Sequence, residues 1–477
     1  MVLHFVLILL LSQPGLSVET LTRQAQEALR MGKYAEARQK LQQALKASPH
    51  NPTLWNFLGL AYAQLNEVDP AIAAFEKVLS ISPRNAPTFF NLGVLYGRKG
   101  DTAKALEVYR QGLALDPTDV PANQNYALLL MGAGRYREAL DPLQKVKEAK
   151  PSDLPVRVAL IECYLKGGMK IQGERETEDL LVSSIPTITD KLKLAQVLLA
   201  DNEPDTAQRV LENAVASSPN SAEAHGELGL LLSKKNQFEE GVRELGRAVQ
   251  LAPDSAKYSM GLAETLLLWN HNAAALEFLL AIKDRFAAIP EFQYKLALAY
   301  YSLHQYPTAI SQLEKLAGQQ PLLDLVQYFL GNSYMAMGDL KEAETYYRRS
   351  IELNPGKAPY YTSLAGLLRK QSDKNIEEAI GFLEKALVLD PADVPSHLQL
   401  GLCYEEKKDL EKAAALLERV TRLSPALLPA HVALARVYYH QGKKEEGDRE
   451  RATVARLEAE EQTRQSQIGH ASRPSQP

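Results

Sequence analysis

Cysteine is nearly absent from this chain of 477 residues, which has only 2, Cys163 and Cys403. They stand far apart, and neither belongs to a Cys-x-x-Cys pair or a His/Cys cluster. A disulfide framework and a structural zinc site both need such groupings, so the sequence excludes them. Each cysteine lies directly before a tyrosine in a similar context, which predicts two small buried thiols.

An excess of positive charge is also missing. The chain has 54 Lys and Arg against 58 Asp and Glu, a formal net charge of −4, and no Lys/Arg-rich run. Proteins that bind nucleic acid usually carry a basic excess that neutralises phosphates, so we expect no nucleic-acid partner. Because a single compact core stops growing near ~250–300 residues, the chain is either several domains or an elongated array.

No apolar run reaches the length of about 20 residues that spans a bilayer. The apolar stretch 1–11 fits the hydrophobic region of a secretory signal peptide, with Gly15 and Ser17 at positions −3 and −1 of a cleavage before Val18. It has no Lys or Arg, so a misassigned start or a buried first helix is the alternative. With residues 1–17 as a signal peptide, we predict an exported protein, periplasmic or secreted, without a transmembrane segment after signal removal. Without that signal the protein is cytoplasmic.

Catalytic and phosphate-binding motifs are missing as well. The sequence contains no Gly-rich phosphate loop, Gly-x-Ser-x-Gly, His-Glu-x-x-His or Gly-Lys-Ser/Thr. Among 9 histidines, His397, His431 and His440 form the best constellation. No third ligand of fitting spacing joins the first two, so ordinary packing is favoured over a metal site. We predict no cofactor, no metal and no enzymatic activity.

A repeat of 34 residues fills most of the chain. Units begin at 18, 52, 86, 120, 154, 188, 222, 256, 290, 324, 358, 394 and 428, cover 18–461, and are spaced by 34 except for one step of 36. Position 8 is Gly or Ala in twelve of the thirteen units, position 20 is small in all of them, and position 32 is proline in ten. The unit 52–85 shows the full pattern: Trp55, Leu58, Gly59, Tyr62, Ala71, Phe75 and Pro83.

These positions have a physical reading. Apolar spacings of three and four predict two short amphipathic helices in each unit. Small residues at positions 8 and 20 let the two helices approach closely, where a larger side chain would cost about 1–3 kcal/mol. Proline at position 32 stops the second helix, and Asn or Asp follows where the next helix needs an N-cap. Left-handed residues are expected to end the first helix at Gly100, Gly134, Gly168, Gly338 and Gly442.

With these residues at these spacings, the sequence resembles the tetratricopeptide repeat family almost from end to end. The resemblance implies an all-α fold, a right-handed superhelical solenoid of tandem antiparallel helix pairs. In such proteins the first helices line the concave side, and positions 2, 5, 9, 12 and 13 point into its groove. The carboxylate clamp of Lys, Asn and Arg known in some relatives is not reproduced, since Asn56 and Asn332 are isolated matches.

Positions 5 and 9 of the first helices would form a mixed floor for a partner protein or peptide. Phe90, Tyr294 and Tyr328 are the expected anchors, unless these side chains merely pack between neighbouring helices. The candidate groove residues are Asn56, Leu60, Phe90, Val94, Gln124, Leu128, Met260, Tyr294, Leu298, Tyr328 and Asn332.

Two units depart from the pattern. Repeat 5 has Ile161 at position 8 and Thr177 at position 24, and repeat 8 has Ala287 where proline belongs. These units are either hinges or degenerate repeats that still stack, and stacking is favoured. Hinges would divide the array into 18–187, 188–289 and 290–461.

The end of the array also differs. Two extra residues within Gln371–Asn375 predict a bulged turn in repeat 11. The last helix is polar, as the terminal cap of a solenoid must be. Residues 462–477 are predicted to form a polar, disordered tail, too short for a catalytic domain.

These observations predict a non-enzymatic scaffold or adaptor that binds a partner segment, outside the cytoplasm. The alternative is an accessory subunit of an envelope machine for polysaccharide export, pilus assembly or secretion. A glycosyltransferase of the O-linked type, in which such arrays precede the catalytic domain, is disfavoured. The sequence does not indicate the oligomeric state.

Overall fold

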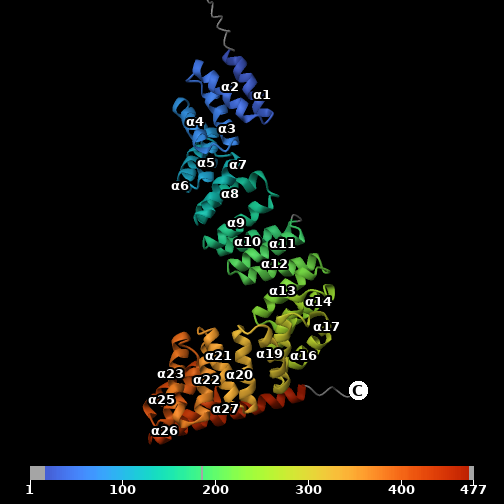
Figure 1. Cartoon of the computed structure of the whole chain (residues 1–477), viewed down its shortest axis with the longest axis vertical. Helices are drawn as coiled ribbons and strands as arrows, with labels where there is room; N and C mark the ends of the chain where they lie inside the picture. The colour runs from blue at the N-terminus through green and yellow to red at the C-terminus, as the bar shows by residue number, and fades with distance from the viewer. Residues whose placement is uncertain (1–16, 184–185, 472–477) are drawn as a thin grey trace, which may run out of the picture. The chain divides into compact units, whose positions relative to one another are not determined.

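The computed structural model describes residues 17–183 and 186–471, and within them the regular structure is entirely helical (Figure 1). The all-α prediction is confirmed. Residues 1–16 of the predicted signal peptide lie outside the described part. Ser17 caps the first helix, where its hydroxyl accepts a hydrogen bond from the amide of Thr20.

The chain forms two compact units, one ending at Leu231 and the other beginning at Leu232, with the boundary inside α13. The first unit contains α1 (Val18–Arg30), α2 (Tyr34–Ala47), α3 (Pro52–Gln64), α4 (Val68–Ile81), α5 (Ala86–Lys99), α6 (Thr102–Leu115), α7 (Val120–Gly132), α8 (Tyr136–Ala149), α9 (Leu154–Lys166), α10 (Lys170–Val182), α11 (Ile188–Ala200), α12 (Pro204–Ser217) and the start of α13 (Ala222–Lys234). The second unit continues with α14 (Phe238–Leu251), α15 (Ala256–Leu268), α16 (Asn272–Ala281), α17 (Lys283–Phe286), α18 (Pro290–Ser302), α19 (Tyr306–Gln319), α20 (Asp324–Met337), α21 (Leu340–Leu353), α22 (Ala358–Gln371), the 3-10 turn η1 (Asp373–Asn375), α23 (Ile376–Leu389), α24 (Val394–Glu406), α25 (Leu410–Leu423), α26 (Leu428–His440) and α27 (Lys444–Ala471).

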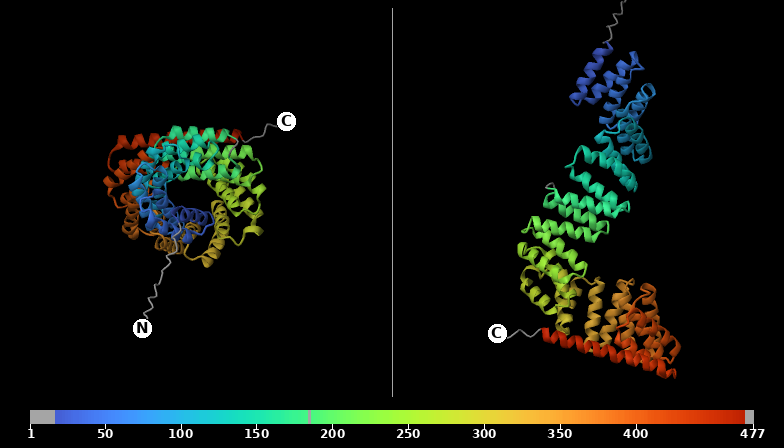
Figure 2. Two further views of the ribbon diagram at one scale, coloured as in Figure 1. Left: turned by 90° about the horizontal axis from the view of Figure 1, so that it is seen from above. Right: turned by 180° about the vertical axis from the view of Figure 1, so that it is seen from behind.

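Successive helices pack in antiparallel pairs, and within each unit the pairs lie side by side in chain order (Figure 2). All thirteen first helices begin at the residues that the repeat frame predicts. Local capping explains this agreement, because in nine of them the side chain before the helix accepts hydrogen bonds from the first turn. These caps are Ser17, Asn51, Asn85, Asp119, Asp153, Thr187, Ser221, Ser255 and Asp393.

The turn between the two helices of a repeat depends on one left-handed residue at position 15. The five predicted glycines have φ between 73° and 83°, and Gly32 has φ 72°. Asn, His or Lys occupies the same conformation in six other repeats. Repeat 11 is the exception, because its two extra residues form η1 and Ser372 has φ −171°.

Positions 8 and 24 form a matched pair of sizes. A Cβ added at Gly59 would lie 2.8 Å from Cε1 of Phe75, and one added at Gly93 would lie 2.4 Å from Cε2 of Tyr109. In these two repeats and in repeat 10 the ring at position 24 occupies the space that glycine leaves on the partner helix, whereas Gly229 and Gly401 are accompanied by leucine at position 24. Alanine at position 8 is likewise accompanied by leucine at position 24 in six repeats: Ala25 with Leu41, Ala127 with Leu143, Ala195 with Leu211, Ala263 with Leu279, Ala297 with Leu313, and Ala365 with Leu383.

In repeat 5 the sizes at positions 8 and 24 are exchanged. Ile161 and Thr177 are 0% and 1% exposed, so the large side chain stands on the first helix and the small one on the second. Lys170 and Glu203 form an ion pair at 2.6 Å between repeats 5 and 6. Repeat 5 therefore stacks on its neighbour despite its irregular sequence.

Repeat 8 is irregular in a different way. Its second helix breaks at Ile282 into α16 and α17, and α18 packs against both α15 and α16. Phe286 of α17 is buried in one cluster with Phe292 of α18, which joins repeat 8 to repeat 9. The boundary between the two compact units lies inside α13.

The last helix is longer than the repeat frame predicts. α27 has 28 residues and ends at Ala471, so residues 462–471 of the predicted tail are helical. Residues 472–477 lie outside the described part. No helix that the structure describes combines the length and the apolar character needed to cross a bilayer.

Candidate partner-binding site

The predicted groove residues lie on the first helices α3, α5, α7, α15, α18 and α20. Val94 and Leu128 are exposed, with 37% and 54% of their surface open to solvent. Met260 is only 2% exposed and packs in the core with Leu279 and Phe292, so the expectation for this residue is corrected. The other eight are half-buried: Asn56, Leu60, Phe90, Gln124, Tyr294, Leu298, Tyr328 and Asn332.

The structure brings three of these residues together between α5 and α7. Two adjoining cavities of about 320 and 240 Å³ share Val94, Tyr109 and Asn125 in their walls. We call their combined lining the α5–α7 groove: Pro87, Phe90, Asn91, Gly93, Val94, Gly97, Tyr109, Asp119, Pro121, Ala122, Asn125, Leu128 and Leu129.

The helix behind the groove fixes its floor. The ring of Tyr109 on α6 is 1% exposed and lies over Gly93, where a side chain would collide with it. Phe90 stacks on Tyr109 at 6.4 Å between ring centroids, and Gly112 of α6 leaves room for the Phe90 ring. Phe90 is therefore held in place before any partner binds, with Val94 and Leu128 left open beside it.

In the second unit the expected anchors belong to a cluster of aromatic rings. Tyr294 packs edge-on against Phe329, with 6.0 Å between the ring centroids, and the ring centroids of Tyr328 and Tyr360 are 4.8 Å apart. Tyr347 donates a hydrogen bond of 2.8 Å to Asn332, and burial raises the pKa of Tyr347 far above its usual value. Asn332 thus joins the two helices of repeat 10, and Tyr328 joins repeat 10 to repeat 11. Both contacts follow the packing alternative that the sequence left open.

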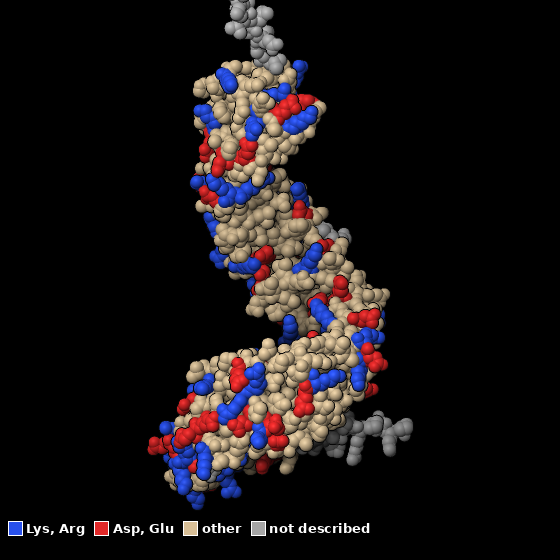
Figure 3. All heavy atoms as spheres, in the orientation of Figure 1, with Lys and Arg blue, Asp and Glu red and all other residues tan. Residues whose placement is uncertain are grey.

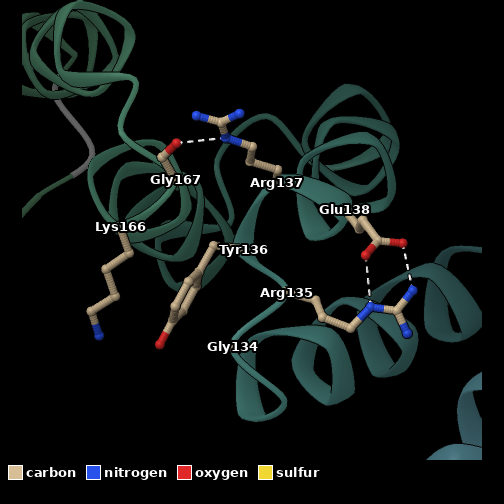
Figure 4. Close-up of a pocket in the computed structure, with 7 residues that line it drawn as sticks. All are labelled: Gly134, Arg135, Tyr136, Arg137, Glu138, Lys166 and Gly167. Carbon is tan, nitrogen blue, oxygen red and sulfur yellow. Dashed lines mark hydrogen bonds and ion pairs between the residues drawn. The ribbon is translucent and has the colours of Figure 1, made fainter.

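A further cavity of about 390 Å³ lies among the turns of repeats 4 and 5 and was not anticipated from the sequence (Figure 4). Arg135 forms a bidentate ion pair with Glu138 at 2.7 and 2.6 Å, and Arg137 donates a hydrogen bond of 2.7 Å to the carbonyl of Gly167. The Lys166 ammonium stands over the ring of Tyr136 at 5.2 Å. The basic side chains that line this cavity contact neighbouring protein groups, so their role is to stabilise the turns.

The histidines at position 4 have structural partners. His397 and His431, both at position 4, donate from Nε2 to the carbonyls of Pro391 and Pro425 at 3.1 and 3.0 Å. The same bond to position 32 of the preceding repeat is made by other donors, namely Trp55, Asn123, His225, Gln293 and Tyr361. Among residues 17–183 and 186–471, no group of three or more His, Cys, Asp or Glu is placed to hold a metal ion.

Both cysteines are buried, as predicted. Burial raises the pKa of the Cys163 thiol to about 12 and that of Cys403 to about 11. Since only the thiolate is an effective nucleophile, neither thiol is reactive at neutral pH.

Charged side chains of both signs are interspersed on the face shown in Figure 3.

Sequence profiles described as tetratricopeptide repeat match residues 22–86, 74–107, 98–156, 198–265, 325–357 and 371–426. The chain belongs to the tetratricopeptide repeat family. The profile matches lie in both compact units, and the α5–α7 groove lies on the first helices of two successive tetratricopeptide repeats, with Tyr109 of the second helix α6 as its floor.

Relatives match parts of this tetratricopeptide chain. A BBSome complex member BBS4 homolog of Drosophila melanogaster is 26% identical over 209 residues, 44% of this chain and 43% of that protein. DnaJ homolog subfamily C member 7 of Mus musculus is 35% identical over 74 residues, 16% of this chain and 15% of that protein. The chain spans less than half the length of either. Yeast Tom70 resembles it with a TM-score of 0.44 and 16% identity, covering 90% of this chain and 96% of that one.

Proposed function

We propose that this protein is a non-enzymatic interaction scaffold whose α5–α7 groove binds an extended or helical segment of a partner protein. The observation that carries the proposal is the exposure of Val94 and Leu128 beside the fixed ring of Phe90. Apolar side chains of this size normally lie in the core, and an exposed apolar patch next to concave walls is typical of a docking site.

The binding energy that the groove can provide indicates how much of the array a partner segment must contact. Fully burying one such side chain contributes about 1.5–3 kcal/mol, and Val94 and Leu128 have only part of their surface left to bury. Together with the matching surface of the partner, the groove provides roughly 4 kcal/mol by this area reckoning. A micromolar complex needs about 8 kcal/mol, so the partner must also contact neighbouring first helices.

Photo-crosslinking in the native host tests the site. A photoreactive residue at Leu128 should capture a discrete partner, and the same residue at the exposed Gln111 on α6 should not. The adduct should be lost when Phe90→Ala and Val94→Ser are combined with the probe. Identical adducts from both probe positions would refute binding in the groove.

A role outside the cytoplasm is part of the proposal and is supported by the apolar stretch 1–11 with small residues before Val18. N-terminal sequencing of the protein from its host should read from Val18. An accessory subunit of an envelope machine is the variant of this proposal in which the captured partner belongs to polysaccharide export, pilus assembly or secretion. Transfer of a labelled sugar from a sugar nucleotide by the pure protein would contradict a non-enzymatic role.

A further inference from the structure

Three leucines stand exposed at the junction of α19 and α20. Leu322, Leu323 and Leu325 have 73%, 37% and 45% of their surface open to solvent, and we call them the leucine patch. Isolated surface leucines are common, but three within four residues concentrate exposed apolar side chains at one turn, which folding alone does not require.

One of these leucines replaces a helix cap. Leu323 is the N-cap residue of α20, and its side chain makes no capping hydrogen bond. A capping Asp, Asn or Ser at such a position contributes typically about 1 kcal/mol, so Leu323 lacks a stabilising contribution that most other first helices have. Ile289, another apolar N-cap, packs against the core cluster of repeats 8 and 9, but Leu323 remains exposed.

Two residues of the leucine patch, Leu323 and Leu325, line a cavity of about 270 Å³, which we call the Tyr294 pocket. It is lined by Pro290, Glu291, Tyr294, Gln320, Leu323, Asp324, Leu325 and Val326. Cavities that hold whole small molecules measure about 300–1,000 Å³, so this one suits one or two side chains. The Tyr294 hydroxyl makes no hydrogen bond to another residue that the structure describes, which leaves it available to a ligand.

The rim of the Tyr294 pocket is acidic. Its lining includes the carboxylates of Glu291 and Asp324 and no Lys or Arg. Burial alone would raise the pKa of Asp324, but hydrogen bonds from Tyr360 at 2.9 Å and Asn354 at 2.8 Å outweigh it and keep the pKa below its usual value. The carboxylate is therefore ionised at neutral pH.

Lys295 only partly offsets the charge of Glu291. Lys295 lies 3.4 Å from Glu291 and 2.9 Å from Glu264, so one ammonium is shared between two carboxylates. Asp324 forms no ion pair with another residue that the structure describes, so the pocket lining keeps a net negative charge. An apolar surface bordered by uncompensated carboxylates attracts a ligand that is apolar and positively charged.

We propose that the leucine patch and the Tyr294 pocket form a second docking site, for a protein segment in which a bulky apolar residue is flanked by Lys or Arg. The apolar side chain enters the pocket and covers the leucines, and the cations pair with Glu291 and Asp324. An anionic membrane surface is excluded by the same carboxylates, because like charges repel. This site shares no residue with the α5–α7 groove.

Fluorescence anisotropy with three labelled synthetic peptides of twelve residues tests this site on the full chain. The first peptide carries a central Leu-Phe anchor and four Lys, the second has Glu in place of Lys, and the third has Ser in place of the anchor. The first should bind at least tenfold tighter than either of the others. Equal binding of the basic and acidic peptides would overturn the proposed chemistry.

Matched variants locate the binding. The double variant Leu322→Ser and Leu325→Ser should weaken binding of the basic peptide at least tenfold, and Glu291→Gln should weaken it several-fold and reduce its salt dependence. Leu423→Ser, at a leucine 45% exposed at the end of α25, should leave it unchanged.

Two further arms exclude rival explanations. The double variant Phe90→Ala and Leu128→Ser, in the α5–α7 groove, should still bind the basic peptide. Loss of peptide binding in that variant would assign the binding to the first unit and overturn the proposed second site. Vesicles with anionic lipid should not bind. Vesicle binding that disappears with the leucine patch would replace the protein partner by a membrane.

Discussion

Replacing Gly59 by alanine tests the matched sizes at positions 8 and 24. The new Cβ would lie 2.8 Å from Cε1 and Cζ of Phe75, closer than non-bonded carbon atoms approach in folded proteins. The ring is 0% exposed, so it cannot swing into solvent. Either the ring or the two backbones must shift by several tenths of an ångström.

Two opposing terms set the magnitude. Alanine inside a helix is favoured over glycine by about 1 kcal/mol, whereas overpacking a core contact costs about 1–3 kcal/mol. We expect Gly59→Ala to lie between no change and about 2 kcal/mol of destabilisation. Gly97→Ala isolates the first term, because its Cβ would meet only Leu129 at 3.9 Å, and it should stabilise by about 1 kcal/mol.

A compensating change completes the test. Phe75→Leu added to Gly59→Ala recreates the Ala and Leu combination of repeats such as 1 and 4, so the double variant should be more stable than the sum of the single effects by at least about 1 kcal/mol. Unfolding in urea can be followed through Trp55, in the first unit, in a Trp269→Phe background. Additive effects, within about 0.3–0.5 kcal/mol, would refute the size pairing.

Three further predictions concern single residues. Lys408 has φ 64°, so Lys408→Gly should raise the unfolding free energy in urea by about 1 kcal/mol, and Ser372→Gly, where φ is −171°, should lower it. Iodoacetamide at pH 8 should label Cys163 only after denaturant is added, because burial raises the pKa of its thiol to about 12, and rapid labelling of the native protein would contradict this burial. Burial and the hydrogen bond to Glu76 raise the pKa of Tyr96 from 10.0 to about 12. The folded state therefore holds the phenol proton more tightly, and the unfolding free energy should fall as the pH rises from 10 to 12, less steeply in Tyr96→Phe.

Helix boundaries were predictable because their causes are local. The N-cap, the proline of the first turn and the left-handed turn residue all act within a few positions, so Asn51 and Pro52 together determine where α3 begins. The partner of a side chain in another helix is not local. The pairing of Gly93 with Tyr109 could be verified only once α5 and α6 were placed against each other.

In the candidate site, too, some features were predictable from the sequence and others depended on contacts between helices. Val94 and Leu128 are exposed as their repeat positions suggest, but Met260 is covered because the break at Ile282 lets α18 pack against both helices of repeat 8. The leucine patch lies outside positions 5 and 9 and was missed. Its signal was nevertheless present in the sequence, as a leucine run where most repeats have a capping residue.

The hydrogen bond from position 4 to the carbonyl at position 32 has a consequence for how this protein can diverge. Five chemically different side chains, those of Trp, Asn, His, Gln and Tyr, close this junction in seven repeats. What these seven residues share at position 4 is a hydrogen-bond donor that reaches the same carbonyl, not a residue type. Alignments that reward chemical likeness would score the column as freely varying, and yet exchanging His397 for leucine would break a junction that glutamine could preserve.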